Sequence, residues 1–375
     1  MTNPFLSLPG AVEATGRDAG IAAHYGNLVT EQRRLADGSA IVDLGNRAVL
    51  TISGPDRLSW LNSITSQSLT GLDAGESSET LLLDLTGRIE HAVRLFEDGE
   101  VLWMLVEHDE AAGLLAWLDK MRFMLRVELA DRSDDFATIG TLGALDLPVA
   151  APNGVDLVWQ DPWRAVVRGG HQYAAGEHPG AGWSWSEVLV PRAELDPIVA
   201  RAASGELAVA GILAVEALRI AAWRPRFATE VDEKTIPHEL DWLRTAVHLN
   251  KGCYRGQETV AKVHNLGHPP RRLVMLHLDG SDGVIPGKGS VVSVERDGER
   301  REVGVVTSSA LHHELGPIAL AVVKRSTDPT ATLQVDAEGV AVSAAQEVVV
   351  PPEAGAEAYV PRLPRLGAVT RHSPR

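Results

Sequence analysis

The chain has 375 residues, a formal net charge of −15 and a single cysteine, Cys253. The length suggests about two or three domains, and the acidic balance argues against nucleic acid as a partner, because phosphate contacts need a basic footprint. One cysteine excludes an intramolecular disulfide, which fits a reducing cytoplasm, and excludes a four-cysteine metal site within one chain. No apolar run is long enough to predict a membrane span and the N-terminus lacks a signal-peptide pattern, so we expect a cytoplasmic protein without a membrane partner.

The first half of the chain predicts mixed strands and helices. Residues 1–25 look irregular. Strands are expected at 41–44, 49–53 and 79–85, and in a hairpin of 89–96 and 101–106 around Asp98-Gly99. A helix should follow Gly54-Pro55-Asp56, and a second should span 109–123 with Leu114, Leu115, Leu118 and Met121 on its inner face.

The second half predicts a different architecture. Residues 136–190 read as strands and loops with Trp183 and Trp185 in the core, followed by helices at 191–203 and 209–223 and an ordered loop with a short helix at 224–250. Strand-like segments at 271–278, 289–295, 301–309 and 317–325, with turn residues between them, suggest a small β-barrel or sandwich. Residues 351–375 read as a flexible or draped tail.

The most informative segment surrounds the cysteine. Residues 250–263 read NKGCYRGQETVAKV, so glycines lie on both sides of Cys253 and Tyr254. Glycine permits a bent loop that exposes a thiol. Lys251 and Arg255 lie within two residues of Cys253, and such cations would lower the pKa of the thiol; Lys251 would then supply charge rather than packing. The alternative is an inert cysteine buried in a tight turn.

The string Lys251-Gly252-Cys253-Tyr254, followed by Gly256-Gln257-Glu258, resembles the K-G-C-Y-x-G-Q-E signature of the YgfZ-type folate-binding proteins. These are relatives of the glycine-cleavage T-protein that assist iron–sulfur cluster assembly. Segments 41–96, 215–241 and 304–321 are also similar to T-protein-like folds. The resemblance implies an α+β fold: a T-protein-like folate-binding body over 20–265, a C-terminal β-barrel over 270–350 and a tail over 351–375, packed around a central cavity near residues 216–227 and 251–272.

Two features of the catalytic relatives are missing. T-proteins carry an Asp after a glycine turn, whereas residues 87–91 read GRIEH and leave Glu90 or His91 as a stand-in acid or base. T-proteins also carry R-L-E-A-G, whose glutamate accepts two parallel bonds from a pterin edge. Residues 219–223 read RIAAW, which puts Ala221 at the glutamate position. Tetrahydrofolate is therefore expected to bind weakly, if at all.

Other ligand contacts implied by the resemblance are Arg219 and Trp223, together with Arg271 and Arg272, whose guanidinium forks suit a folate carboxylate. Trp223 would stack on a ligand or fill the cavity, and filling is favoured because aromatic side chains are more often core. The alternative for the arginine pair is a solvated strand end.

The sequence thus predicts an accessory protein for the assembly or repair of iron–sulfur clusters, with iron–sulfur client or assembly proteins as partners. Cys253 would be its centre, supported by Lys251 and Tyr254. No stable metal is expected, because Gly267 and prolines break the helix that His264 and His268 would need, and Cys253 offers at most one transient cluster ligand. The alternatives are a tetrahydrofolate-dependent one-carbon (aminomethyl or methyl) transferase or demethylase, and a binding module without chemistry.

Overall fold

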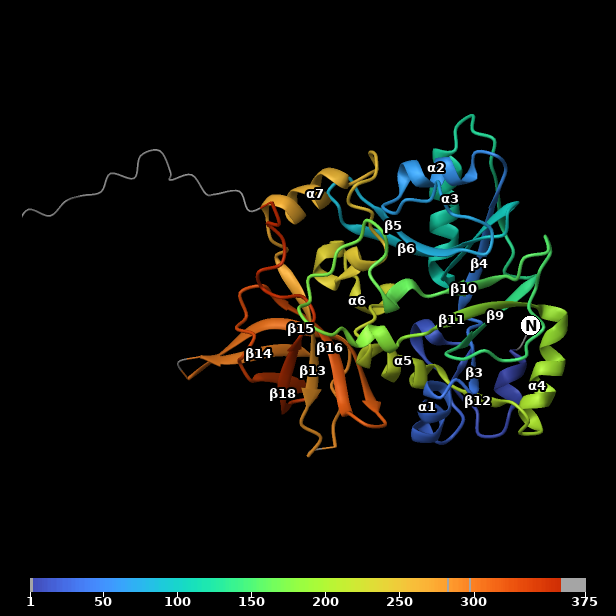
Figure 1. Cartoon of the computed structure of the whole chain (residues 1–375). Coiled ribbons are helices and arrows are strands. Elements are labelled where there is room, and N and C mark those ends of the chain that lie inside the picture. The colour runs from blue at the N-terminus through green and yellow to red at the C-terminus, as the bar shows by residue number, and fades with distance from the viewer. Residues whose placement is uncertain (1–2, 282, 297, 359–375) are drawn as a thin grey trace, which may run out of the picture.

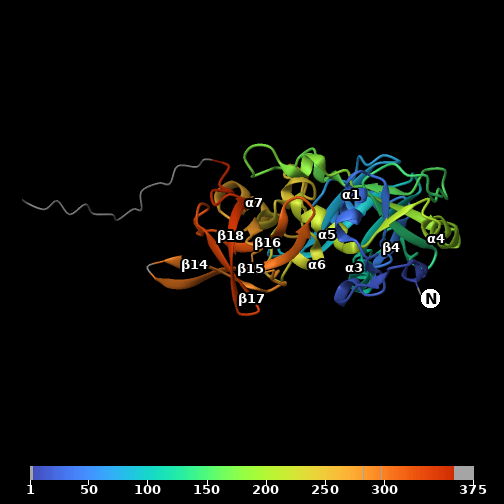
Figure 2. The ribbon, with the colours of Figure 1, turned by 90° about the horizontal axis from the view of Figure 1, so that it is seen from below.

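The computed structural model describes residues 3–281, 283–296 and 298–358. It consists of an α+β body built on two five-stranded sheets and a closed six-stranded barrel that packs against one side of the body (Figure 1). Figure 2, seen from below, shows the barrel at one end of an elongated molecule and the two sheets at the other. Within the described residues no helix has the length and apolar character that a membrane crossing requires.

The first sheet carries the elements that later surround Cys253. Its strands are all antiparallel and follow the order β5 (Ser77–Leu83), β6 (Ile89–Glu97), β7 (Val101–Glu107), β4 (Arg47–Ser53) and β8 (Glu128–Asp131). Helices α2 (Arg57–Ile64) and α3 (Ala111–Met121) cover one face of this sheet. Trp60 on α2 and Leu114 and Leu118 on α3 join the strand residues in one buried cluster. The Asp98-Gly99 turn between two apolar runs and the helical spacing of the leucines account for both predictions, which are confirmed.

The second sheet has the order β10 (Val158–Gln160), β11 (Ser186–Pro191), β9 (Phe136–Thr141), β3 (Ala40–Asp43) and β12 (Ala208–Ala210). Only β12 and β3 pair in parallel. Helices α1 (Leu28–Ala36), α4 (Leu195–Ala203) and α5 (Ile212–Ala221) pack around it. Short strands β1 (Val12–Glu13) and β2 (Ala22–His24) form a ribbon within the segment that the sequence marks as irregular.

One predicted helix is too long at its start. Residues 208–210 are strand β12, and helix α5 begins only after Gly211. A side chain on Gly211 would place its Cβ 2.1 Å from the carbonyl oxygen of Ala23, so the chain there is pressed against β2. That close approach belongs to tertiary packing, and the apolar run 209–223 gives no sign of it.

The barrel is closed by β13 (Arg271–Leu278), which pairs with both β16 (Gly316–Lys324) and β18 (Val340–Val348). Strands β14 (Val291–Arg296), β15 (Glu299–His312) and β17 (Leu333–Ala337) complete the ring. The sequence predicts the first four strands but misses β17, although LQVDA alternates apolar and polar residues, and β18, which is rich in small residues. Residues 351–358 continue past the barrel, and the rest of the predicted tail lies outside the described residues.

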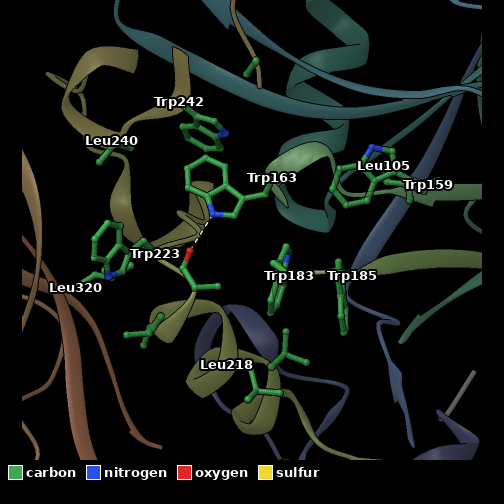
Figure 3. Packing of buried hydrophobic residues seen from close by; sticks show 14 of the residues in the cluster. Leu105, Trp159, Trp163, Trp183, Trp185, Leu218, Trp223, Leu240, Trp242 and Leu320 are labelled. Carbon is green, nitrogen blue, oxygen red and sulfur yellow. Dashed lines mark hydrogen bonds between the residues drawn. The ribbon is translucent and has the colours of Figure 1, made fainter. Parts of the chain in front are cut away.

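Tryptophans dominate the large core between the sheets and the barrel (Figure 3). Trp183 and Trp185 are buried with their rings stacked at 5.7 Å, which confirms their predicted place in the core. Trp163 donates a hydrogen bond of 2.9 Å to the carbonyl oxygen of Ala222, at the end of α5. The junction of body and barrel is therefore a packed interface.

Candidate functional site around Cys253

Cys253 lies in the loop that runs from the short helix η8 (Trp242–Arg244) to helix α7 (Gln257–Leu266). The loop crosses the body: the amide of His248 donates to the carbonyl of Ser66 at 3.0 Å, and the amide of Leu249 donates to the carbonyl of Gly169 at 2.8 Å. These bonds, from two neighbouring residues, fix the first part of the loop to the segment that follows α2 and to the long loop between β10 and β11. The thiol is thus carried by an anchored segment.

Gly256 sets the bend after the cysteine. Its φ is +83°, and a Cβ there would lie 2.6 Å from the carbonyl oxygen of Asp84 and 3.0 Å from Cα of Gly87. Gly87 also has a positive φ, and a Cβ on it would lie 2.8 Å from that of Thr259 on α7. The two glycines therefore allow the β5–β6 turn to press against the cysteine loop. Gly252, by contrast, has no positive φ, and a Cβ added to it would meet nothing within 4 Å. Of the two glycines that the sequence predicts to bend the loop, only Gly256 therefore needs to be a glycine.

Lys251 holds the loop to the end of α2. Its Nζ donates to three backbone carbonyl oxygens, those of Asn62 (2.6 Å), Thr65 (2.7 Å) and Gln67 (2.6 Å). Burial lowers the pKa of this ammonium group to about 8. The sequence predicts that this lysine supplies only charge near the thiol, but it also satisfies carbonyls that would otherwise be unpaired at a helix end. These hydrogen bonds are a role that the sequence did not reveal, and the effect of the lysine's charge on the thiol stays a prediction.

The remaining motif residues order the loop. Tyr254 is buried, and the Lys251 ammonium lies 5.2 Å from its ring centroid. The side chain of Gln257 donates to the carbonyl of Lys251 at 3.3 Å, while Glu258 is exposed in the first turn of α7, where an acid suits the helix dipole. Arg255 forms an ion pair with Glu90 on β6 and lies over the Trp117 ring at 5.6 Å.

Cys253 itself is exposed. It borders a groove of about 580 Å³ between the end of α2, the β5–β6 turn and α3. The groove is lined by Ser63, Ile64, Leu85, Trp117, Met121, Cys253, Tyr254 and Arg255. The sequence identified the thiol but not the groove, because its apolar walls come from segments up to 190 residues away.

Tyr254 also lines a second, polar cavity of about 310 Å³ on the side of α7. His171 and His264 face each other there, with ring centroids 4.8 Å apart, and His264 Nδ1 lies 3.0 Å from the hydroxyl of Tyr173. His268 bonds to the carbonyl of Ala354 instead. Among the described residues no group of three or more His, Cys, Asp and Glu side chains is arranged to hold a metal.

The candidate ligand residues His91 and Arg219 lie apart from the thiol. His91 Nδ1 lies 3.3 Å from Glu110, and its ring stacks on Phe227. Burial raises the pKa of Glu110. Arg219 is buried and bonded to Glu216 and Glu230. Its guanidinium is therefore already paired with carboxylates of the protein and is not available to a ligand.

Trp223 has a φ of +57° and points toward the barrel, where its Nε1 donates to the sulfur of Met275 at 3.2 Å. It lines an open groove of about 530 Å³ together with Glu177 and Glu347. Ala221 is half-buried and packs against the large core. The ring therefore fills space at the body–barrel interface.

Arg271 and Arg272 point to different places, since side chains alternate along β13. Arg271 is bonded to Asp232 and Glu239, and these bonds raise its pKa although burial acts in the opposite sense. Arg272 is fully buried and donates to the carbonyl of Thr327 and to Gln346. The structure thus does not bring the two arginines together.

An ion-pair network that the sequence does not reveal occupies the middle of the molecule. Arg224 is bonded to Glu79 and Asp161, and Arg226 is bonded to Glu107. Between these groups and the sheet only about 10 Å³ remains, enclosed by Glu79, Ala92, Val93, Arg94, Glu107, Arg224, Pro225, Phe227 and Trp242. The predicted single cavity near 216–227 and 251–272 is wrong, because these stretches line four separate spaces.

Similarity to known proteins agrees with this fold. Residues 271–352 match the family described as the glycine cleavage T-protein C-terminal barrel domain. The chain is 27% identical over 324 residues to an aminomethyltransferase of Herpetosiphon aurantiacus, covering 84% of this chain and 86% of that protein. It is 26% identical over 283 residues to a putative chloroplastic transferase of Arabidopsis thaliana, covering 72% of this chain and 62% of that protein.

A solved structure extends the likeness to the whole fold. The glycine cleavage system aminomethyltransferase T from Bartonella henselae superposes with a TM-score of 0.70 over 92% of this chain and 94% of that chain, at 17% sequence identity. The chain therefore has a T-protein-like fold and is related to aminomethyltransferases. The narrower YgfZ-type assignment stays a prediction.

Proposed function

We propose that this protein is a YgfZ-like accessory factor for the assembly or repair of iron–sulfur clusters, and that it acts through Cys253 on a partner protein. The observation that carries the proposal is the exposed position of the only thiol beside an apolar groove, on a loop held by Lys251 and Gly256. A cysteine that served only packing would be buried, as free cysteines usually are.

The number of thiolates decides how such a protein could handle a cluster. A cluster needs about four protein ligands, and each chain supplies one cysteine. A cluster in contact with Cys253 would therefore be cargo whose other ligands come from the partner. The chain's own residues would present the thiol: Gly256 sets the bend, and Lys251 fixes the loop.

Folate fits this structure poorly. The position expected to accept the pterin is Ala221, and the space beside Arg224 and Phe227 is about that of one water molecule. The groove at Trp223 carries Glu177 and Glu347, which would repel the carboxylates of a folate tail. The proposed action of Cys253 therefore does not use tetrahydrofolate.

A tetrahydrofolate-dependent one-carbon transferase is the second candidate. It is favoured by the similarity to aminomethyltransferases over most of the chain. It is opposed by the closed centre of the molecule, where only about 10 Å³ remains beside Arg224 and Phe227. An aminomethyl-transfer assay with a lipoyl carrier distinguishes the two, since a transferase would form methylene-tetrahydrofolate.

The test is reconstitution of an apo [4Fe–4S] dehydratase with ferrous iron, sulfide and a thiol reductant, with and without the protein. We expect faster recovery of dehydratase activity with the native chain and the basal rate with Cys253→Ser. Ser63→Ala, at the same groove, is the matched control and should behave as the native chain does. Equal rates with native and Cys253→Ser proteins would overturn the proposal.

A further inference from the structure

Large apolar side chains are exposed around the groove at Cys253. Leu85 is 79% exposed, Phe123 81% and Met124 97%. We call the apolar face the set of Leu85, Trp117, Met121, Phe123, Met124 and Leu125. Three of these side chains, Leu85, Trp117 and Met121, line the groove, and the last three follow Arg122 directly along the chain. Clustered apolar exposure of this kind marks interaction surfaces.

The loop after α3 is held with these side chains outward. Phe123 has a φ of +46°, which is uncommon for a bulky residue and is maintained only where the surroundings impose it. The amide of Arg126 donates to Asp56 at 2.9 Å, and its guanidinium binds the same carboxylate. The exposure of Phe123 and Met124 is therefore a property of an anchored loop (top right in Figure 1).

The charge of this region is opposite to that of the whole chain. Segments 84–88, 117–126 and 251–255 carry six basic and two acidic residues, whereas the chain has a net charge of −15. Arg122, Arg126 and Arg255 have carboxylate partners. Arg88 and Lys120 are exposed and have no ion pair within the described part of the chain. Positive charge thus borders the apolar face.

We propose that the groove and the apolar face bind a segment of a partner protein that inserts a bulky apolar side chain and carries acidic residues on either side of it. This inference rests on the proposed function, because the segment would belong to the protein on which Cys253 acts. The groove, about 580 Å³, falls within the usual range of ligand-sized pockets, roughly 300–1,000 Å³.

A protein segment is favoured over a membrane. The surface is concave at the thiol, so it suits a protruding side chain better than a flat bilayer. Complementary charge around an apolar anchor is the usual composition of specific protein interfaces.

The experiment is fluorescence anisotropy on the full chain with a labelled peptide that has a central Leu-Phe pair and two glutamates at each end. Control peptides replace the glutamates with lysines, or the Leu-Phe pair with two serines. We expect the acidic apolar peptide to bind at least tenfold more tightly than either control, and more weakly as sodium chloride is raised, because exposed charges are screened.

Variants locate the binding. Leu85→Glu and Lys120→Glu replace exposed side chains and should each weaken binding at least fivefold, whereas Leu311→Glu, an exposed leucine of the barrel, should leave it unchanged. Circular dichroism verifies that each variant is folded. Equal binding of the three peptides, or binding of phosphatidylserine vesicles in place of the peptide, would overturn the inference.

The two proposals can fail separately. Cys253→Ser should bind the acidic apolar peptide as the native chain does, because docking does not need the thiol. If Leu85→Glu loses the peptide but still accelerates cluster reconstitution, the partner of Cys253 does not dock on this surface, and the inference is refuted while the proposed function stands. If docking persists while reconstitution does not depend on Cys253, the proposed function is refuted alone.

Discussion

Gly87 and Gly256 meet backbone against backbone: a Cβ on Gly256 would lie 3.0 Å from Cα of Gly87. One belongs to the β5–β6 turn and the other is the N-cap residue of helix α7. Because both lack side chains, the turn that carries Leu85 and the loop that carries Cys253 become neighbours. The groove depends on this contact.

Gly256→Ala should destabilise the protein by about 1–3 kcal/mol, because it adds a Cβ 2.6 Å from the Asp84 carbonyl oxygen at a positive φ. Gly252→Ala is the matched control and should change stability by less than about 0.5 kcal/mol, since nothing lies near it. Urea unfolding midpoints measure both. Equal effects of the two substitutions would contradict the assigned role of Gly256.

Lys251→Met should lower the free energy of unfolding by about 1–3 kcal/mol, because it keeps the aliphatic stem but leaves three carbonyl oxygens without their donor. Lys120→Met, at an exposed site, serves as the control. Denaturant unfolding provides the measurement. If both variants are as stable as the native chain, the ammonium group does not hold the loop.

Cys253 should react with iodoacetamide in the folded protein, because its side chain is exposed. Glu90→Gln should increase this rate severalfold, since it releases Arg255 from its carboxylate partner and leaves a positive charge near the thiol. Alkylation followed by mass spectrometry gives the rates, with a cysteine peptide as the reference. A thiol that reacts only after denaturation would rule out the proposed role.

Glu216 should make the protein sensitive to acid. Burial acts to raise its pKa, but Arg219 and Arg226 outweigh this and lower it to about 2. Since the folded-state pKa lies below the unfolded value of about 4.5, Glu216 contributes stability that is present above pH ~4.5 and is lost as pH falls through about 2.

Glu216→Gln should therefore cost on the order of 3 kcal/mol near neutral pH and flatten the loss of stability between pH ~4.5 and ~2. Thermal unfolding across this pH range checks the slope. Glu233→Gln, an exposed acid in the neighbouring loop, should leave the profile unchanged. A native-like profile for Glu216→Gln would show that its arginine contacts contribute nothing.

Tetrahydrofolate should bind no tighter than micromolar to the native chain, because the centre is occupied by Arg224, Phe227 and Trp242. The double variant Ala221→Glu with Trp223→Gly restores the T-protein residue types but should not bind folate either, since those three side chains remain. Calorimetric titration tests both proteins. Sub-micromolar affinity in the native chain would refute the closed centre, and affinity gained only in the variant would show that Trp223 alone blocks the site.

Local patterns made part of this molecule predictable. The hairpin around Asp98-Gly99, the leucine spacing of α3 and the first strands of the barrel follow from alternation, turn residues and helical periodicity, which act over a few neighbouring residues. Strand β18 and the start of α5 did not follow. Small residues fill a closed barrel without a strong apolar pattern, and Gly211 is needed for a contact with Ala23.

The sequence by itself determined the chemistry at one point: a single thiol between glycines and cations, at residues 251–256. Tertiary structure decided what surrounds it. Lys251 binds carbonyls after α2, Arg255 binds Glu90, and Leu85 and Met121 form the groove walls. It also decided that the centre is filled by ion pairs between residues such as Arg226 and Glu107. Such contacts join segments far apart in the chain, so only the fold, which sets their distances, can specify them.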